Sequence, residues 1–296
     1  MGVAGSTVLL GGKKEACAES LKVSPNQYGV LVDTTRCIGC RRCEKACNDI
    51  NIDLPRKDAE TYKDDKVFEQ RRRMDFGSYT VVNRYRNKEK PSRPLFAKFQ
   101  CMHCLYPTCV SACIVGALTR DKTGAVLYDA GKCIGCRYCM QACPFQVPAY
   151  EYKNAFTPEV RKCTFCFTKR LSCSQTPACV QSCPMEVMTF GKRNDLLEIA
   201  KKRIADKPGN YVPHIYGENE AGGTAWLYLS SVNFQDIDLP ALGTQPLPDY
   251  TEPIQHAIFK WFLPPVTLYA TLGGIWWYMK NRNKNKSAST QDKEKL

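Results

Sequence analysis

Cysteines in four groups of four constrain this chain more than any other feature. The chain has 18 cysteines among 296 residues, and all except Cys17 and Cys173 fall into groups that begin with C-x2-C and end with C-x3-C. The groups are Cys37, Cys40, Cys43, Cys47; Cys101, Cys104, Cys109, Cys113; Cys133, Cys136, Cys139, Cys143; and Cys163, Cys166, Cys179, Cys183. A chain of this length needs no disulfide framework to be stable. We therefore expect the grouped cysteines to bind metal, and we interpret Cys17 and Cys173 as structural or incidental.

The spacing within the groups indicates which metal centre they bind. The first and third groups match the ferredoxin run C-x2-C-x2-C-x3-C, which ligates 4Fe-4S clusters. Three soft thiolates in a tight loop bind three irons of one cubane, and the fourth reaches the neighbouring cluster. The second group delays its third cysteine by two residues, and a longer loop interrupts the fourth group. The pattern predicts four 4Fe-4S clusters, with all sixteen grouped cysteines as iron ligands.

Some details depart from ferredoxins or leave another metal open. Pro144 and Pro184 follow the last cysteine of the third and fourth groups as in ferredoxins, whereas Asn48 and Ile114 stand there in the first two groups. Zinc also binds paired C-x2-C, so a zinc-stabilised binding module is the alternative, although zinc gives no reason for a third cysteine so close. We interpret His103, inside the second group, as a surface or hydrogen-bonding residue rather than a ligand.

The positive net charge of the chain raises the question of whether it binds nucleic acid. The chain has 42 Lys and Arg residues against 29 Asp and Glu, a formal net charge of +13. Four cubanes, each with a net charge of about −2, would bring the balance to roughly +5. The basic residues are scattered among the cysteine groups and form neither a long basic helix nor an aromatic groove. We therefore expect no nucleic-acid binding.

Short strand patterns alternate with the cysteine groups. The expected strands are Tyr28–Asp33, Ser78–Tyr85, Ala117–Arg120, Ala125–Asp129 and Thr224–Leu229. Gly124 is expected to form the turn of a hairpin between the third and fourth of these. The segment NDLLEIAKKRIA predicts an amphipathic helix with Leu197, Ala200 and Ile204 on its apolar face and Asn194 or Asp195 as its N-cap. This mixture predicts an α+β fold.

A long charged segment separates the first two cysteine groups. Residues 48–100 are rich in charged and aromatic side chains and contain the basic run Arg71–Arg73. An insertion of this kind either presents a partner surface or forms a solvated surface loop. The sequence leaves both interpretations open.

The C-terminal region contains a candidate membrane span. Trp261–Met279 is a run of 19 residues without a charge, which forms a helix of about 28 Å against a hydrocarbon core of about 30 Å. Four basic residues follow the run, at positions 280, 282, 284 and 286, whereas only Lys260 lies close before it. The positive-inside rule then places the C-terminus in the cytoplasm and the cluster domain outside. A buried helix of a soluble domain is the alternative.

The location of the cysteines bears on export. Clusters assemble on reduced thiols, so the domain is expected to fold in the cytoplasm and to cross the membrane already folded. Met1–Gly12 is small and apolar, with Lys13 and Lys14 after it. This order is the reverse of a signal peptide, so the segment is either the remnant of an export signal or a flexible terminus.

The motifs together resemble a known family. The four cysteine groups in this order, HIYGENEAGGTAWLYL at 214–229, and IQHAIFK at 254–260 before one membrane helix resemble the iron-sulfur subunit of periplasm-facing nickel-iron uptake hydrogenases of the hydrogenase-2 type. The resemblance covers most of residues 26–282. The beta subunit of membrane-bound formate dehydrogenase is similar over the same span, and the IQH sequence favours the hydrogenase subunit.

The resemblance implies a role and partners. The chain would not be an enzyme by itself, and its sequence shows no acid-base or nucleophilic constellation. It would transfer electrons in a membrane-bound respiratory oxidoreductase of the bacterial inner membrane. Its partners would be catalytic hydrogenase subunits, or a molybdopterin formate dehydrogenase subunit, together with an integral membrane quinone-reactive subunit and the lipid bilayer.

The resemblance also implies how the cysteines are shared among clusters. The first and fourth groups would share one pair of clusters, and the second and third groups the other pair. The implied ligand sets are set I (Cys37, Cys40, Cys43, Cys183), set II (Cys47, Cys163, Cys166, Cys179), set III (Cys101, Cys104, Cys109, Cys143) and set IV (Cys113, Cys133, Cys136, Cys139).

The implied architecture is two ferredoxin-like modules, each binding two 4Fe-4S clusters, plus one C-terminal transmembrane helix. The expected boundaries are 1–25 for the terminus or signal remnant, 26–94 and 155–205 for a discontinuous first module, 95–154 for the second module, 206–253 for a connecting segment, 254–280 for the transmembrane helix and 281–296 for a cytoplasmic tail.

Overall fold

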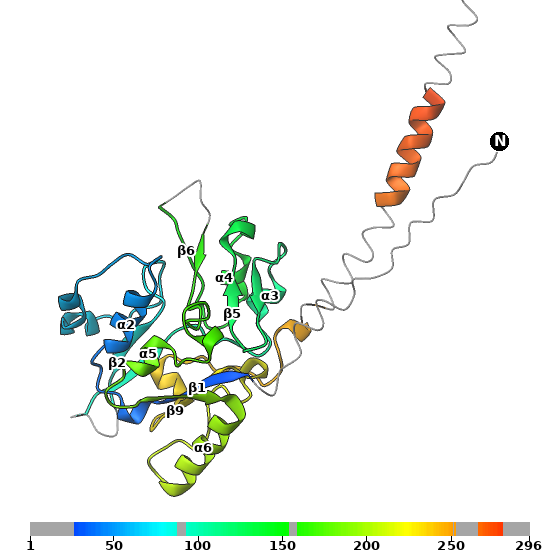
Figure 1. Ribbon diagram of the computed structural model, residues 1–296. Helices are drawn as coiled ribbons and strands as arrows, with labels where there is room; N and C mark the ends of the chain where they lie inside the picture. The colour runs from blue at the N-terminus through cyan, green and yellow to red at the C-terminus, as the bar shows by residue number, and fades with distance from the viewer. Residues whose placement is uncertain (1–26, 88–92, 154–158, 251, 253–265, 281–296) are drawn as a thin grey trace, which may run out of the picture. The chain divides into compact units, whose positions relative to one another are not determined.

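The computed structural model describes residues 27–87, 93–153, 159–250, 252 and 266–280. Contacts divide the chain into a body, residues 1–248, and a C-terminal unit, residues 249–296. The expected segments 1–25 and 281–296 lie outside the described residues. The described body mixes short helices and strands (Figure 1), so the α+β prediction is confirmed.

A three-stranded sheet forms the centre of the body. Its order is β8-β1-β9, in which β1 (Tyr28–Asp33) pairs antiparallel with β8 (Met188–Lys192) and parallel with β9 (Trp226–Leu229). A central strand covered on both faces is an uninterrupted apolar run, as in YGVLVD. The strands expected at Tyr28–Asp33 and 224–229 are confirmed. Because β9 comes from the expected connecting segment, that segment also contributes to the core.

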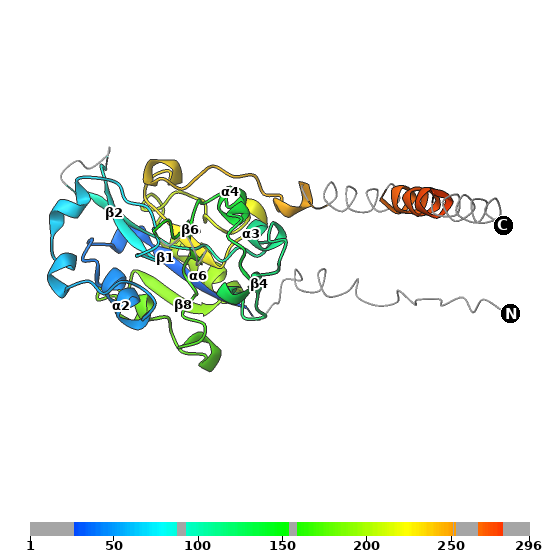
Figure 2. The same ribbon diagram turned by 90° about the horizontal axis from the view of Figure 1, so that it is seen from above.

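The two faces of this sheet have different neighbours. Side chains alternate between faces along a strand, so Leu31 and Leu227 pack against Leu196 and Ala200 of helix α6 (Arg193–Asp206). Figures 1 and 2 show α6 beside this sheet. On the opposite face, the side chains of alternate residues join the main core with several of the grouped cysteines; these residues are Val30, Val32, Trp226 and Tyr228.

Helix α6 corrects two details of the sequence prediction. Its N-cap is Lys192, whose side chain makes no capping bond, so the expected cap at Asn194 or Asp195 is wrong. The fully buried leucine is Leu196 at 1% exposure, while Leu197 packs at the edge of the same cluster. The antiparallel pairing of β8 with β1 leads straight into α6, and this connection sets the start of the helix without a polar cap.

Four short helices carry cysteines of the four groups. Helix α2 (Arg42–Ile50) contacts α5 (Ala178–Gln181), and α3 (Thr108–Ser111) contacts α4 (Tyr138–Ala142). Figure 1 shows α2 and α5 together, apart from α3 and α4. The first cysteine group therefore lies beside the fourth, and the second beside the third.

Three hairpins complete the strands. They are β2 (Val81–Tyr85) with β3 (Leu95–Phe99), β4 (Leu118–Arg120) with β5 (Val126–Tyr128), and β6 (Ala149–Tyr150) with β7 (Val160–Arg161), all antiparallel. The expected β4–β5 hairpin is confirmed, with Gly124 at φ 93° in its turn. Strand β3 belongs to the expected second module by sequence but pairs with β2 of the first.

Short 3-10 helices connect these elements. They are η1 (Thr34–Arg36), η2 (Ala59–Tyr62), η3 (Asp65–Phe68), η4 (Ala130–Lys132), η5 (Leu171–Cys173), η6 (Glu220–Gly222) and η7 (Phe234–Ile237). Elements η2 and η3 lie in the charged segment 48–100, where Leu54, Tyr62, Phe68 and Tyr79 are buried. This segment therefore packs onto the body and is more than a solvated loop.

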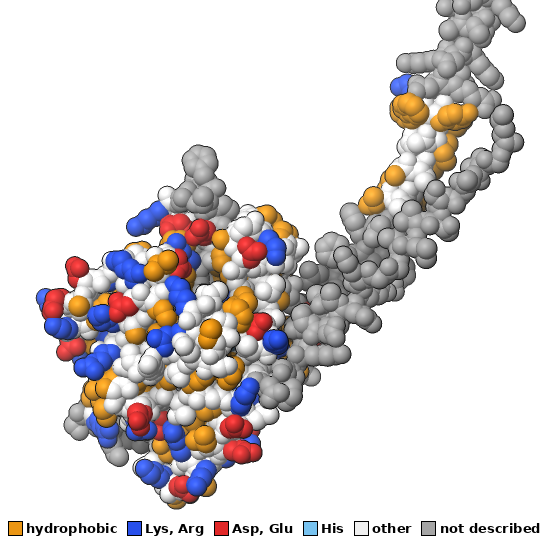
Figure 3. Space-filling view, viewed as in Figure 1, with side chains coloured by type: hydrophobic (Ala, Val, Ile, Leu, Met, Phe, Trp, Pro, Cys, Tyr) orange, Lys and Arg blue, Asp and Glu red, His pale blue; other side chains and the backbone are white. Residues whose placement is uncertain are grey.

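The described part of the C-terminal unit includes a helix at residues 266–280. The expected membrane span starts at Trp261, and residues 261–265 lie outside the described residues. Among the residues that the structure describes, no helix is both long and apolar enough to cross a membrane. Large apolar side chains on this helix are exposed, among them Leu268, Leu272, Ile275 and Trp276 (Figure 3).

Candidate iron-sulfur sites

One backbone feature recurs in all four cysteine groups. The third residue of each C-x2-C adopts a left-handed conformation: φ is 73° at Gly39, 47° at His103, 69° at Gly135 and 58° at Phe165. Glycine takes this conformation at no steric cost, whereas other residues pay for it. The glycines of the first and third groups therefore predict this turn from the sequence. The turns at His103 and Phe165 could not be predicted from their residue types.

The turn directs backbone amides at cysteine sulfurs. The N–H of Gly135 donates to Cys133 Sγ at 3.4 Å, and the N–H of Phe165 donates to Cys163 Sγ at 3.4 Å. Amides aimed at a thiolate favour its charged form. The loops are thus shaped for negatively charged sulfur ligands.

Ligand set I is assembled from two cysteine groups that lie far apart in the sequence. Cys37 lies close enough to interact electrostatically with Cys183 and Cys40, and Cys43 interacts with Cys37. The contact of α2 with α5 brings these residues together. The structure therefore joins the first group to the last cysteine of the fourth group, as the resemblance implied.

Ligand set II surrounds a cavity. Cys47 interacts with Cys163, Cys166 and Cys179, and all four line one cavity together with Lys98 and Trp226. The cavity also contacts Asn51, whose side-chain amide donates to Cys47 Sγ at 3.4 Å. Four thiols converge here from two distant cysteine groups.

The cysteines of sets III and IV are likewise neighbours within their sets. The interacting thiols of set III are Cys101, Cys104, Cys109 and Cys143. Those of set IV are Cys113, Cys133, Cys136 and Cys139. The contact of α3 with α4 places the second and third groups side by side.

Neighbouring sets also lie near one another in a row. Cys43 of set I is close enough to Cys179 of set II to interact with it electrostatically, and so is Cys163 of set II to Cys101 of set III. Cys109 of set III interacts in the same way with Cys139 of set IV. The order along the body is therefore I, II, III, IV.

The two ends of this row reach the surface. Cys40 of set I and Cys136 of set IV are exposed, while every cysteine of sets II and III is buried or partly buried. Beside them, Ile38 and Ile134 are 54% and 57% exposed. An apolar side chain and a thiol thus meet solvent at each end of the row.

Burial shifts the thiols toward their neutral form. Burial, with nearby cysteines adding to it, raises the pKa of Cys37 and of Cys139 to about 11. Burial raises the pKa of Cys143 to about 11 as well. Without metal, these three thiols therefore hold their protons at neutral pH, and metal binding must displace those protons.

The donor sets fit four-iron clusters. Each set offers four thiols and no oxygen or nitrogen ligand from the motifs, which is the soft donor set of iron-sulfur clusters. Within the described ranges, no three Cys, His, Asp or Glu side chains are spaced to hold one single metal ion. The thiolates of a cubane each bind a different iron and so stand farther apart.

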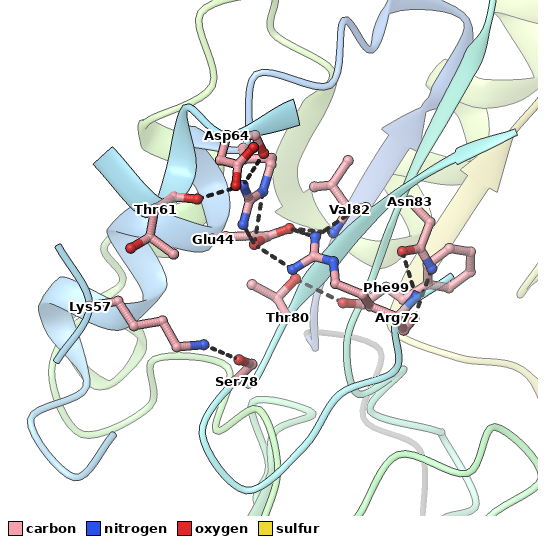
Figure 4. Close-up of polar contacts among 11 residues, drawn as sticks. Glu44, Lys57, Thr61, Asp64, Arg72, Ser78, Thr80, Val82, Asn83 and Phe99 are labelled. Atoms are coloured by element: carbon pink, nitrogen blue, oxygen red, sulfur yellow. Dashed lines mark hydrogen bonds and ion pairs between the residues drawn. The ribbon is translucent and has the colours of Figure 1, made fainter. Parts of the chain in front are cut away.

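A buried ion network supports the first group. Glu44 in α2 accepts from Arg41 at 3.1 Å, from Arg72 at 2.5 Å and from the backbone N–H of Val82 at 2.6 Å. Arg41 also donates to the carbonyl of Thr61 at 2.8 Å. Figure 4 shows Glu44 on the helix side, with dashed lines to Arg72 and Val82 on the strand side. The network ties α2 to the inserted segment and to β2.

The basic run Arg71–Arg73 has partners within the body. Arg72 is in the ion network, Arg71 pairs with Asp238, and Arg73 donates to Gln146. On the face seen in Figure 3, basic and acidic side chains are interspersed. The run therefore braces the insertion against later parts of the chain.

The structure corrects the interpretation of His103. Its side chain has 0% exposure, so the surface interpretation is wrong, and its Nδ1 accepts from the N–H of Val126 at 2.9 Å, so the hydrogen-bonding interpretation is confirmed. Its ring stacks on Phe165 at 4.8 Å between centroids. Burial and two nearby lysines lower the pKa of His103 well below its ordinary range, so the ring is neutral.

The remaining cysteines and the replaced proline have simple outcomes. Cys173 is exposed, and Cys17 lies outside the described residues. Asn48, which stands where ferredoxins have proline, donates to the carbonyl of Pro55 at 2.8 Å and accepts from the N–H of Lys57. Its side chain thereby fixes the start of the insertion.

Sequence patterns gave no sign of the buried Lys98 in the cavity of set II.

Fold and sites together define an iron-sulfur electron-transfer protein, and comparisons with known proteins agree. Residues 93–193 match the 4Fe-4S dicluster domain family. The hydrogenase-2 operon protein HybA of Escherichia coli O157:H7 is 37% identical over 299 residues, covering 91% of this chain and 89% of that protein. The chain belongs to the family of 4Fe-4S electron-transfer subunits that includes HybA.

Two further relatives show how the family extends. A protein of Nitratidesulfovibrio vulgaris is 50% identical over 255 residues, which cover 85% of this chain and 68% of that protein. The formate dehydrogenase iron-sulfur subunit of Haemophilus influenzae is 33% identical over 253 residues, which cover 83% of this chain and 76% of that subunit. The chain is therefore similar to subunits of more than one oxidoreductase.

Proposed function

We propose that this chain carries electrons through four 4Fe-4S clusters, held by sets I to IV, between a catalytic hydrogenase subunit and a quinone-reactive membrane subunit. The observation that carries the proposal is the single row of four thiol sets with an exposed cysteine at each end. When bound, the clusters supply one-electron transfer. The chain's own residues hold them in order and shield the inner two from water.

Iron content tests the number of clusters. The purified protein should contain about sixteen irons per chain, because each of four cubanes has four irons. A content near eight, or stoichiometric zinc, would contradict four clusters. Metal analysis with protein quantification decides between these outcomes.

The relay itself is tested by removing one ligand at each end. Cys40→Ser and Cys136→Ser each replace an exposed thiolate by a hydroxyl, which binds iron more weakly. We expect hydrogen oxidation with an artificial dye to survive and hydrogen-to-quinone transfer to collapse. Normal quinone reduction in a variant shown by spectroscopy to lack that cluster would exclude a single relay.

The similarity to HybA favours a nickel-iron hydrogenase as the partner, and the similarity to a formate dehydrogenase subunit supports a second candidate. Affinity purification of the tagged chain from membranes, followed by metal analysis of the complex, separates the two. Nickel in the complex supports the first candidate, and molybdenum supports the second. A complex with neither metal contradicts both.

We further propose that Trp261–Met279 spans the bacterial inner membrane once, with the cluster domain on the periplasmic side. The uncharged run, the basic residues after it and the exposed apolar side chains at 266–280 support this. A reporter that is active only in the cytoplasm should be active when fused after Leu296. A fused reporter that is active only in the periplasm would reverse the topology.

A further inference from the structure

A lysine lies buried in the body without an acidic partner. Lys98, in β3, is 3% exposed. Its ammonium donates to Gln100 Oε1 at 2.7 Å and lies 4.5 Å from the ring centroid of Trp226. Among the described residues, no carboxylate comes within ion-pair distance of it. A buried charge without a counter-charge costs several kcal/mol, so this lysine needs an anion.

The surroundings of Lys98 identify that anion. Lys98 lines the cavity of set II with Cys47, Cys163, Cys166 and Cys179. Cys43 of set I and Cys179 of set II lie close enough to Lys98 to interact with it electrostatically. When these thiols lose their protons on binding a cluster, their negative charge would compensate the ammonium of Lys98.

A second residue with an unpartnered donor lines the same cavity. Trp226 has 0% exposure and lines the cavity, and its indole N–H has no hydrogen-bond partner among the described residues. A buried donor of this kind usually has a partner. Lys98 and Trp226 are held together because Gln100 also donates to Tyr228, which follows Trp226 on β9 by two residues.

We propose that Lys98, assisted by the indole N–H of Trp226, is a positioning residue that raises the reduction potential of the cluster held by set II. This inference rests on the proposed function, in which set II holds a cubane. On reduction the cluster accepts one electron from its neighbour in the relay, and its net charge with four thiolates changes from about −2 to about −3. A fixed positive charge favours the more negative state, and burial keeps water and salt from screening it.

Among the residues that the structure describes, one other lysine is buried, and it differs from Lys98. Lys162 is also 3% exposed, but its ammonium donates to the carbonyls of Val126 at 2.5 Å and Cys163 at 3.2 Å. It is not among the residues that line the cavity of set II. Lys162 therefore donates to backbone oxygens away from this cavity, whereas Lys98 lines the cavity beside the four thiols.

The experiment is a redox titration of the full-length purified protein with dithionite as the reductant. Electron paramagnetic resonance monitors the reduced clusters at each potential. Lys98→Met removes the charge and keeps the length of the side chain, Lys98→Gln keeps a polar group, and Lys98→Arg keeps the charge. Lys45→Met is the matched control, because Lys45 is only partly buried on α2 and is paired with Asp49 at 2.6 Å. No partner subunit is needed, so the result does not depend on whether the chain serves a hydrogenase.

We expect the two neutral variants to lower the midpoint potential of one cluster by at least about 59 mV. For one electron, this shift corresponds to a tenfold change in the ratio of reduced to oxidised cluster at a given potential. Lys98→Arg and Lys45→Met should keep the wild-type midpoints. Full iron content with unchanged midpoints in Lys98→Met overturns the proposal. If the neutral variants lose iron and Lys98→Arg keeps it, the charge is required to hold the cluster, which supports the assignment. Loss of iron in all three variants shows a packing role and overturns it.

Discussion

The first and third cysteine groups share a sequence and a backbone but differ in what surrounds them. Both read CIGCR, and both place a left-handed glycine, Gly39 or Gly135, before the second cysteine. The arginine that follows is also left-handed in both, with φ 57° at Arg41 and 61° at Arg137. The loop that receives a cluster is therefore a local structure, specified by a few residues.

The surroundings of the two loops diverge directly after these residues. Arg41 is buried and paired with Glu44, whereas Arg137 is exposed and lies over the ring of Tyr150, 5.4 Å from its centroid. At the position of Glu44 the third group has Met140, which packs at the edge of an apolar cluster. Helix α2 has 9 residues, and α4 has 5. Identical loops are thus stabilised by ions in one module and by apolar and aromatic contacts in the other.

Glu44→Ala should have the largest effect, because it leaves Arg41 and Arg72 without their carboxylate inside the body. Removing one partner of a buried ion network costs about 3–5 kcal/mol. Met140→Ala at the matching position of the third group should cost about 2 kcal/mol at most, since Met140 is only partly buried. Denaturant-induced loss of cluster absorption, with Glu44→Gln as an intermediate control, measures both. Equal midpoints for Glu44→Ala and Met140→Ala would remove the distinction between the modules.

Gly39→Ala should be more damaging than Gly135→Ala, although the two glycines have nearly the same backbone. Both substitutions incur the left-handed penalty of roughly 1–2 kcal/mol. A Cβ on Gly39 would in addition lie 2.5 Å from the ring of Phe96, which adds about 1–3 kcal/mol of overpacking. Iron content and thermal unfolding of the two variants give the comparison. If Gly39→Ala combined with Phe96→Ala is no better than Gly39→Ala alone, the overlap with the ring is not the cause.

Arg137→Ala should have the smallest effect. The arginine is exposed and its contact with Tyr150 contributes about 1 kcal/mol or less. Arg41→Ala, by contrast, removes a buried partner of Glu44 and the contact with Thr61. The shift in the unfolding midpoint should follow this order. A larger shift for Arg137→Ala would mean that the outer loop depends on its charge more than its exposure indicates.

The sequence predicted the metal-binding loops well because ligand spacing is a local property. The cysteine groups, the turn at Gly124 and the strand at Tyr28–Asp33 follow from residue types at fixed distances along the chain. The resemblance supplied the sharing of cysteines among sets, and the proximity of Cys37 to Cys183 agrees with it. The boundaries of the two modules and the number of clusters stay predictions.

What sequence patterns could not reveal depends on residues that meet only after folding. Lys98 is the one charged residue of β3 (LFAKF) and would ordinarily be assigned to a solvated face. It is buried because Tyr228 of β9 donates to its backbone carbonyl and Trp226 covers its ammonium. His103 looked like a polar surface residue because its partners, Val126 and Phe165, also meet it only after folding. No local signal in the sequence announces such partners.

The crossing of ligands between the first and fourth cysteine groups has a consequence for the order of maturation. Sets III and IV are encoded entirely within residues 101–143, so their ligands are present as soon as that stretch has been synthesised. Set I also needs Cys183, and set II also needs Cys179. Trp226, which lines the cavity of set II, is synthesised later still. Chains fold from the N-terminus during synthesis. We expect the second pair of clusters to be loaded first, while Cys37, Cys40 and Cys43, which the ribosome makes earliest, wait longest for their metal.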